Sequence, residues 1–133
     1  MGQHDRKRGK IHVRIALPNG GSVDEADVAL IEAIEACGSI LGTSRHIAVS
    51  YRKTWLMVDA LNRTFDTKVI ETFPGRAAGA KVTDFGHRLV ALFRSVERRS
   101  SSAAAGAIDE LVASLDWKFE QELAGGARAA GRG

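Results

Sequence analysis

The chain of 133 residues contains a single cysteine, Cys37, and has no long apolar run. One cysteine excludes an internal disulfide framework and every zinc module that needs several cysteines. A membrane-spanning helix needs roughly 18 to 20 consecutive apolar residues, and no segment approaches that length. The basic start, MGQHDRKRGK, is not followed by a hydrophobic segment that would act as a signal peptide. We therefore expect a cytoplasmic protein with no membrane partner.

Signatures of catalysis and metal binding are also missing from the sequence. There is no nucleophile elbow, no carboxylate–histidine cluster, and no glycine loop that follows a strand and opens a helix. Gly20 and Gly21 precede a helix, but the acidic residues that follow them would repel phosphate. His46 and His87 have no second ligand pair at metal-binding spacing, and Cys37 at a helix end is typical of a structural thiol. We expect no enzymatic activity, no metal site and no cofactor.

The net charge is only +3, but it is unevenly distributed along the chain. Residues 1–21 carry +4, and residues 38–99 carry +6 from eleven basic and five acidic side chains. Residues 22–37 carry −5, and residues 107–124 carry −4. Ordinary solvated helix faces would explain the acidic segments. The basic ones favour a protein with one nucleic-acid-binding face and other faces turned to solvent or to a partner.

The first part of the chain predicts an arm, a strand and a helix. Residues 1–9 are polar and basic, which predicts a flexible arm. In residues 11–17 every second side chain is large and apolar, which predicts a strand with one buried face. A turn at 18–21 and an amphipathic helix over 24–36 follow, with Gly38 as a left-handed cap.

The middle of the chain has the pattern of two helices joined by a tight turn. Ser39 can cap a short helix that spans 40–47. A break follows at 48–50, and Ser50 can cap a longer helix over 51–65. This is the pattern of a helix-turn-helix.

The longer helix separates apolar side chains from basic ones. Large apolar residues recur every three or four positions and predict one buried stripe, formed by Trp55, Val58, Leu61 and Phe65. Arg52, Lys53 and Arg63 lie off that stripe, so these cations project outward. In a DNA-binding helix-turn-helix, the N-terminal residues of the second helix enter the major groove. Arg52 and Lys53 occupy that end.

The next segment predicts a hairpin. Residues 68–73 predict a short strand, residues 74–80 a loop that contains glycine, and Lys81 with Val82 a return strand. We expect this hairpin to form a wing over 74–81.

Two helical patterns and a tail complete the chain. Thr83 can cap a long helix that begins at Asp84 and ends before a Ser/Ala-rich linker at 99–106. A second apolar pattern predicts a C-terminal helix over 107–124. The Gly/Ala/Arg composition of residues 125–133 predicts a disordered tail.

Residues 10–98 closely resemble the N-terminal DNA-binding domain of ModE-type molybdate regulators, which are LysR-like winged helix-turn-helix proteins. The resemblance rests on the element order and on the segments GSI…SYRKTWLMVDALN, KVIETFPG and KVTDFGHRLVALFR. Its most specific residues are Ser50, Tyr51, Arg52, Trp55, Asp59, Leu61, Asn62, Thr83, Gly86 and Leu89.

The resemblance implies an α+β fold, mainly helical: a winged helix-turn-helix with a short N-terminal strand, a β-hairpin wing and long C-terminal dimerisation helices. It does not imply molybdate binding, because such regulators bind the oxyanion in separate C-terminal domains. The 35 residues after Arg98 are too few to form them, so we expect a single-domain relative. The chain departs from the family at Ala48, where glycine is usual. A left-handed backbone there costs alanine about 1 kcal/mol.

We therefore predict a sequence-specific DNA-binding transcriptional regulator, located at the nucleoid, that binds an inverted repeat in double-stranded DNA as a homodimer. Recognition would use the helix at 51–65 and the wing at 74–81. The candidate DNA-binding residues are Ser50, Tyr51, Arg52, Lys53, Arg45, Arg76 and Lys81. The segment 107–124 can pack on its own domain, cross to the partner subunit or bind another protein. Two alternatives stay open: a low-specificity architectural DNA-binding protein, and a winged-helix protein-interaction module.

Overall fold

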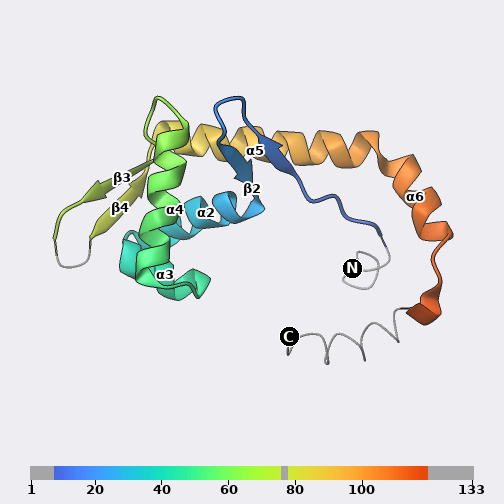
Figure 1. The fold of residues 1–133 in the computed structure, drawn as a ribbon, viewed down its shortest axis with the longest axis horizontal. Coiled ribbons are helices and arrows are strands. Elements are labelled where there is room, and N and C mark those ends of the chain that lie inside the picture. The colour runs from blue at the N-terminus through green and yellow to red at the C-terminus, as the bar shows by residue number, and fades with distance from the viewer. Residues whose placement is uncertain (1–7, 76–77, 120–133) are drawn as a thin grey trace. The chain divides into compact units, whose positions relative to one another are not determined.

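The fold comes from a computed structural model that describes residues 8–75 and 78–119. In chain order the elements are β1 (Arg14–Ala16), β2 (Ser22–Asp24), α2 (Glu25–Cys37), α3 (Ile40–Ile47), α4 (Tyr51–Thr64), β3 (Ile70–Phe73), β4 (Gly79–Val82), α5 (Asp84–Ala103) and α6 (Ala105–Ala113) (Figure 1). The predicted α+β class, mainly helical, is confirmed. Two small antiparallel sheets, β1–β2 and β3–β4, accompany the helices. This set of elements is compatible with a winged helix.

Two compact units divide the chain. Residues 11–100 form the larger unit, which runs from β1 through most of α5. Residues 1–10 and 101–133 form the smaller unit, of which residues 8–10 and 101–119 are described and include α6. The hydrophobic core belongs to the larger unit.

The hairpin β1–β2 begins the larger unit, with Ile15 opposite Val23. The alternation predicted for 11–17 is present, since its large apolar side chains are half-buried and those between them are exposed. The predicted turn at 18–21 closes the hairpin through hydrogen bonds between Leu17 and Gly21 and between Gly20 and Leu17. The sequence did not predict β2, because this short strand leads directly into α2 and has no separate pattern of its own.

Side-chain caps set the ends of α2 and α3. The Asp24 carboxylate accepts a hydrogen bond from the Asp27 N–H, and the Asp27 carboxylate accepts one from the Asp24 N–H. Gly38 ends α2 in the left-handed conformation, with φ of 71°, as predicted. Ser39 caps α3, also as predicted, by accepting a hydrogen bond from the N–H of Gly42 at 3.0 Å. These local bonds explain why the helix boundaries could be predicted closely from sequence.

The hairpin β3–β4 pairs Ile70 with Val82 and Phe73 with Gly79. The first strand, predicted over 68–73, is observed over Ile70–Phe73. The return strand begins earlier than predicted, at Gly79 rather than at Lys81.

Backbone pairing also joins this hairpin to the connection between α2 and α3. The Ala80 N–H donates to the Gly38 carbonyl at 3.0 Å, and the Ile40 N–H donates to the Ala78 carbonyl at 3.1 Å. Ser39 and Gly79 form an isolated antiparallel bridge. The start of α3 is therefore fixed to one edge of the hairpin.

The core is formed by apolar side chains of α2, α3, α4, α5 and both hairpins. Its fully buried side chains include Leu30, Ile31, Ile34, Ile40, Val58, Val69, Ile70 and Phe93. Trp55 and Phe65, predicted as core residues, are half-buried and pack against this cluster. The Phe65 ring meets the edge of Phe85 at a centroid distance of 5.2 Å.

Asn62 of α4 holds the chain just before and at the start of β3. Its Oδ1 accepts hydrogen bonds from the N–H groups of Val69 and Ile70 at 2.9 and 3.0 Å. Its Nδ2 donates to the carbonyl of Ile70 at 2.9 Å. Val69 and Ile70 are both fully buried, so this one side chain satisfies backbone groups that water cannot reach.

The start of α5 also contacts the segment formed by Val69 and Ile70. The Thr83 N–H donates to the Val69 carbonyl at 3.0 Å, and its hydroxyl accepts the Gly86 N–H at 3.0 Å, which confirms the predicted cap. A Cβ on Gly86 would lie 2.5 Å from the Val69 carbonyl oxygen. We call Asn62, Thr83 and Gly86, with the backbone of Val69 and Ile70 between them, the Val69 clamp.

Two expectations for the C-terminal part are corrected. The linker predicted at 99–106 is helical instead, because α5 continues to Ala103 and α6 begins at Ala105. Alanine has the highest helix propensity and serine is tolerated on exposed helix surfaces, so a Ser/Ala-rich stretch need not end a helix. The predicted helix at 107–124 is observed as Ala105–Ala113, in which no side chain is fully buried.

Several expectations fall on residues that the structure does not describe. These are residues 1–7 of the predicted arm, residues 120–124 of the predicted C-terminal helix, and the tail at 125–133. They stay predictions from the sequence.

Replacing Asn62 with alanine should lower the free energy of unfolding by about 2 kcal/mol or more. Two buried N–H groups would lose their acceptor, and each buried unsatisfied group costs about 1 to 3 kcal/mol. The measurement is urea unfolding followed by circular dichroism. Asn19→Ala is the matched control, since Asn19 also bonds backbone groups but at an exposed site. Equal losses for the two variants would contradict the importance of the clamp.

Replacing Gly86 with alanine should also destabilise the larger unit, by about 1 to 3 kcal/mol, because the added methyl overlaps the Val69 carbonyl and forces the helix away from it. Gly106→Ala in α6 serves as a control, since a Cβ there meets nothing within 4 Å. Thermal unfolding of both variants checks the expectation. A Gly86→Ala variant as stable as the parent would show that α5 does not approach β3 this closely.

Candidate nucleic-acid interface

The connection between α3 and α4 is a tight turn of three residues, 48–50. Ala48 ends α3 with φ of 58° and ψ of 42°, the left-handed conformation. The Val49 N–H donates to the Ser44 carbonyl at 3.1 Å and closes the turn. The turn therefore keeps the glycine-type backbone although the residue is alanine.

Ser50 caps α4, as predicted. Its hydroxyl oxygen accepts a hydrogen bond from the Lys53 N–H at 3.0 Å. The Thr54 side chain, fully buried, donates to the Ser50 carbonyl at 2.9 Å. These bonds fix the first turn of α4, on which Tyr51, Arg52 and Lys53 lie.

The first turn of α4 presents three exposed side chains, Tyr51, Arg52 and Lys53. Neither cation forms an ion pair with any residue that the structure describes. Further along the helix, Arg63 lies 3.5 Å from the Asp59 carboxylate. Positive charge without an acidic neighbour is therefore concentrated at the N-terminal end of α4, where the helix dipole is also positive.

The other predicted cations have different surroundings. Arg45 is exposed in the last turn of α3, shortly before the tight turn. Lys81 is exposed on β4 but lies directly opposite Glu71 of β3, so the charge of that face is partly balanced. Arg76 falls outside the described residues.

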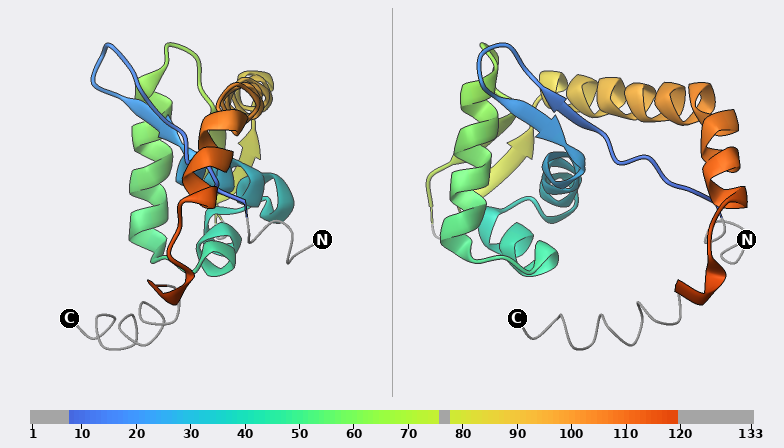
Figure 2. Two further views of the ribbon diagram at one scale, coloured as in Figure 1. Left: turned by 90° about the vertical axis from the view of Figure 1, so that its right-hand side faces the viewer. Right: turned by 45° about the vertical axis from the view of Figure 1, so that its right-hand side comes forward.

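A hollow of about 420 Å³ lies between the first turns of α4 and the hairpin β3–β4. Figure 1 and the right-hand view of Figure 2 show the hairpin beside α4. Tyr51 and Trp55 line the hollow from the helix, and Thr72, Phe73 and Pro74 line it from the hairpin. The Tyr51 and Trp55 rings meet edge to face at a centroid distance of 6.3 Å.

Sequence reasoning missed two exposed apolar residues beside these cations. Phe73, at the end of β3, is 49% exposed, and Leu56, one turn after Arg52 on α4, is 57% exposed. Phe73 had a signal in the sequence, since it is an aromatic residue directly before the Pro-Gly of the loop. For Leu56 the sequence offered one signal: it is a large apolar residue that lies outside the predicted buried stripe of its helix.

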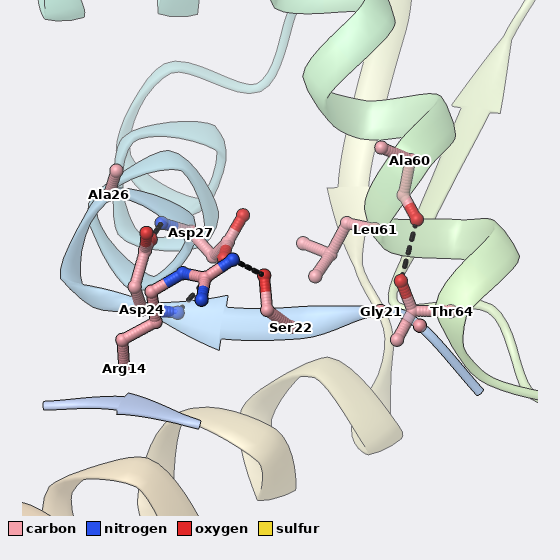
Figure 3. Close-up of a pocket in the computed structure, with 10 residues that line it drawn as sticks. Arg14, Gly21, Ser22, Asp24, Ala26, Asp27, Ala60, Leu61 and Thr64 are labelled. Atoms are coloured by element: carbon pink, nitrogen blue, oxygen red, sulfur yellow. Dashed lines mark hydrogen bonds between the residues drawn. The ribbon is translucent and has the colours of Figure 1, made fainter. Parts of the chain in front are cut away.

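A second hollow, of about 440 Å³, lies at the other end of α4 and is different in character (Figure 3). Its polar groups bond to one another: Asp24 with Asp27, Thr64 with the Ala60 carbonyl, and Arg14 with Ser22 at 3.5 Å. Burial raises the pKa of Asp27, against the hydrogen bond it accepts from Asp24. Acidic groups make this hollow unlike the basic end of α4.

Among the described residues there is neither a metal-binding cluster nor a helix that could span a membrane. Within residues 8–75 and 78–119, no three His, Cys, Asp or Glu side chains gather closely enough to hold a metal ion. Among those same residues, no helix combines the length and apolar character needed to cross a membrane.

Comparison with known proteins relates the chain to molybdenum-linked regulators and binding proteins. The chain is 30% identical over 86 residues to the molybdenum transport protein ModE of Azotobacter vinelandii, a match to 63% of this chain and 32% of that protein. It is 38% identical over 72 residues to the molybdenum-pterin-binding protein MopA of Rhodobacter capsulatus, a match to 53% of this chain and 27% of that protein.

A further relative is the transcriptional regulator ModE of Haemophilus influenzae, 29% identical over 99 residues, which are 73% of this chain and 39% of that protein. No family model matches the chain. The chain spans about a third of the length of the curated relatives it matches. These matches support a relationship to the ModE and Mop proteins over part of the chain.

Replacing Ala48 with glycine should stabilise the protein by up to about 1 kcal/mol, because glycine adopts the left-handed backbone without steric cost. Ala48 is exposed, so the substitution removes little buried area. Thermal unfolding measures the change, with Ala60→Gly in the exposed middle of α4 as the opposite control, expected to destabilise by about 1 kcal/mol. Destabilisation by both substitutions would contradict the left-handed turn.

Proposed function

We propose that residues 11–100 form a winged helix-turn-helix domain that binds duplex DNA in a sequence-specific manner and regulates transcription. In this reading α4 is the recognition helix and the hairpin β3–β4 is the wing. The observation that carries the proposal is the capped first turn of α4, which presents exposed Arg52 and Lys53 with no described acidic partner.

The chemistry of the first turn suits the major groove. An α-helix fits that groove, and arginine or lysine can donate to the O6 and N7 acceptors of guanine or to phosphates. The Ser50 cap and the buried Thr54 hold the turn in one conformation, which lowers the entropic cost of binding. Arg52 and Lys53 would make the contacts that read the sequence.

Other predicted residues would position the duplex. Tyr51 offers a phenolic hydroxyl, and Arg45 a guanidinium, to phosphates on either side of the groove. The Ser50 hydroxyl is available as a donor to a phosphate, while its oxygen serves the cap. Lys81 and Arg76 would contact phosphates from the wing, Lys81 less strongly because Glu71 lies opposite.

The larger unit also has a surface suited to a second copy. Leu92 and Val96 of α5 are 45% and 38% exposed. They border an apolar hollow of about 210 Å³ whose other walls come from the hairpin β1–β2, Phe65 and α5. Burying such a surface is favourable, so we propose a homodimer that binds two half-sites of an inverted repeat, about one helical turn or roughly 34 to 36 Å apart.

One of the relatives is named a transcriptional regulator, which supports a role in regulation. The names of the other two relatives refer to molybdenum, and that property belongs to those proteins and is not proposed for this chain. Because the chain spans about a third of their length, we extend to it only the proposal of DNA-linked regulation without catalysis.

Replacing Arg52 or Lys53 with alanine should weaken DNA binding without changing the free energy of unfolding, since both side chains are exposed. If the side chain contacts a base, we expect the affinity to fall by about 5- to 100-fold. If it contacts a phosphate, the slope of log affinity against log salt should become shallower by about one. Fluorescence anisotropy with a labelled duplex measures both quantities.

Arg63→Ala is the matched control, because Arg63 lies on the same helix but beside Asp59. It should bind almost as well as the parent. If Arg52→Ala and Lys53→Ala bound as tightly as Arg63→Ala, α4 would not be the reading element.

A further inference from the structure

The hollow between α4 and the wing is placed where a DNA strand would have to pass. The first turn of α4 would lie in the major groove and the wing beside it, so one strand crosses the gap between them. Tyr51 and Trp55 form one wall of that gap, and Phe73 and Pro74 form the other. The volume of about 420 Å³ is in the range of sites that hold small ligands.

None of the described residues that line the hollow carries a charge, and most of them are apolar. Phe73 is 49% exposed and Tyr51 is 44% exposed. Large apolar side chains exposed together beside a concave surface mark a site of contact. The group that fills the hollow should therefore be largely apolar itself.

The ring geometry argues against a stacked base. The planes of Tyr51 and Trp55 stand at 86° to each other. Bases bind to proteins by lying flat on an aromatic face, whereas a corner between perpendicular rings suits a compact, non-planar group. In a duplex the bases are also stacked inside, and the backbone is what faces a protein outside the grooves.

The exposed cations on the first turn of α4 indicate what the apolar group is attached to. Arg52 and Lys53 follow Tyr51 directly, and the N-terminus of α4 adds its dipole. Exposed cations on the same helical turn as a residue that lines an apolar hollow match the alternation of phosphate and sugar along one strand. Of the parts of that strand, the sugar ring is the compact, non-planar and largely apolar one.

We propose that the hollow holds one deoxyribose of the duplex, packed against Phe73, while Arg52 and Lys53 engage the adjoining phosphates and base edges. This inference rests on the proposed function and adds to it a contact that is apolar, not ionic. Phe73 thus contacts the DNA directly and positions one DNA strand between the recognition helix and the wing.

The test compares Phe73→Ala and Phe73→Leu with the parent on a labelled 30-base-pair duplex of fixed mixed sequence, over a series of NaCl concentrations. Phe73→Ala should bind about five- to tenfold more weakly, from the apolar area lost, with an unchanged slope of log affinity against log salt. Phe73→Leu should bind nearly as well as the parent, because contact with a sugar needs apolar area and not a flat ring. Phe119→Ala, at a residue that is 58% exposed outside the larger unit, is the matched control and should bind like the parent.

The outcomes separate the two proposals. A parent protein that does not bind this duplex at low salt and enriches no sequence from a randomised duplex pool overturns the proposed function. A parent that binds with a steep salt dependence, together with a Phe73→Ala variant that binds equally well, overturns only the sugar contact. A Phe73→Leu variant as weak as Phe73→Ala would indicate a base stacked on the ring and would also overturn it. Circular dichroism confirms that each variant is folded.

Discussion

Asn62 joins the helix that carries the exposed cations to the strand beside it, through three hydrogen bonds to the backbone of Val69 and Ile70. Because these backbone groups are fully buried, water cannot replace the amide. Thr83 and Gly86 hold the same segment from the start of α5. The Val69 clamp therefore sets the positions of α4, the hairpin β3–β4 and α5 relative to one another.

The proposed DNA-binding surface depends on that constraint. A recognition helix and a wing can hold one DNA strand between them only if the gap between them has a fixed width. The clamp fixes one end of the gap. At the other end, backbone pairing of Gly38 and Ile40 with the hairpin fixes the start of α3. Hydrogen bonds thus hold the hairpin both to α4 and to the start of α3, while the side chains of the first turn of α4 are exposed.

The sequence predicted most of the features that depend on neighbouring residues. The caps Ser39, Ser50 and Thr83 and the left-handed Gly38 act over three or four residues, so their pattern is visible in the chain. Long-range pairing was not visible: β2, the bridge between Ser39 and Gly79, and the bonds of Asn62 all depend on the fold. For the site, periodicity placed Arg52 and Lys53 on an exposed turn. Periodicity could not indicate Phe73, whose proposed role depends on a hollow formed with residues of α4. It also could not indicate that Lys81 lies opposite Glu71.

The measurement that tests the account most directly is selection of bound sequences from a randomised duplex pool at near-physiological salt, with the mass of the protein determined by light scattering in the same buffer. The account predicts an enriched inverted repeat and the mass of a dimer, because two copies of α4 would read two half-sites. A folded protein that enriches no motif would contradict sequence-specific regulation and favour an architectural or protein-binding role.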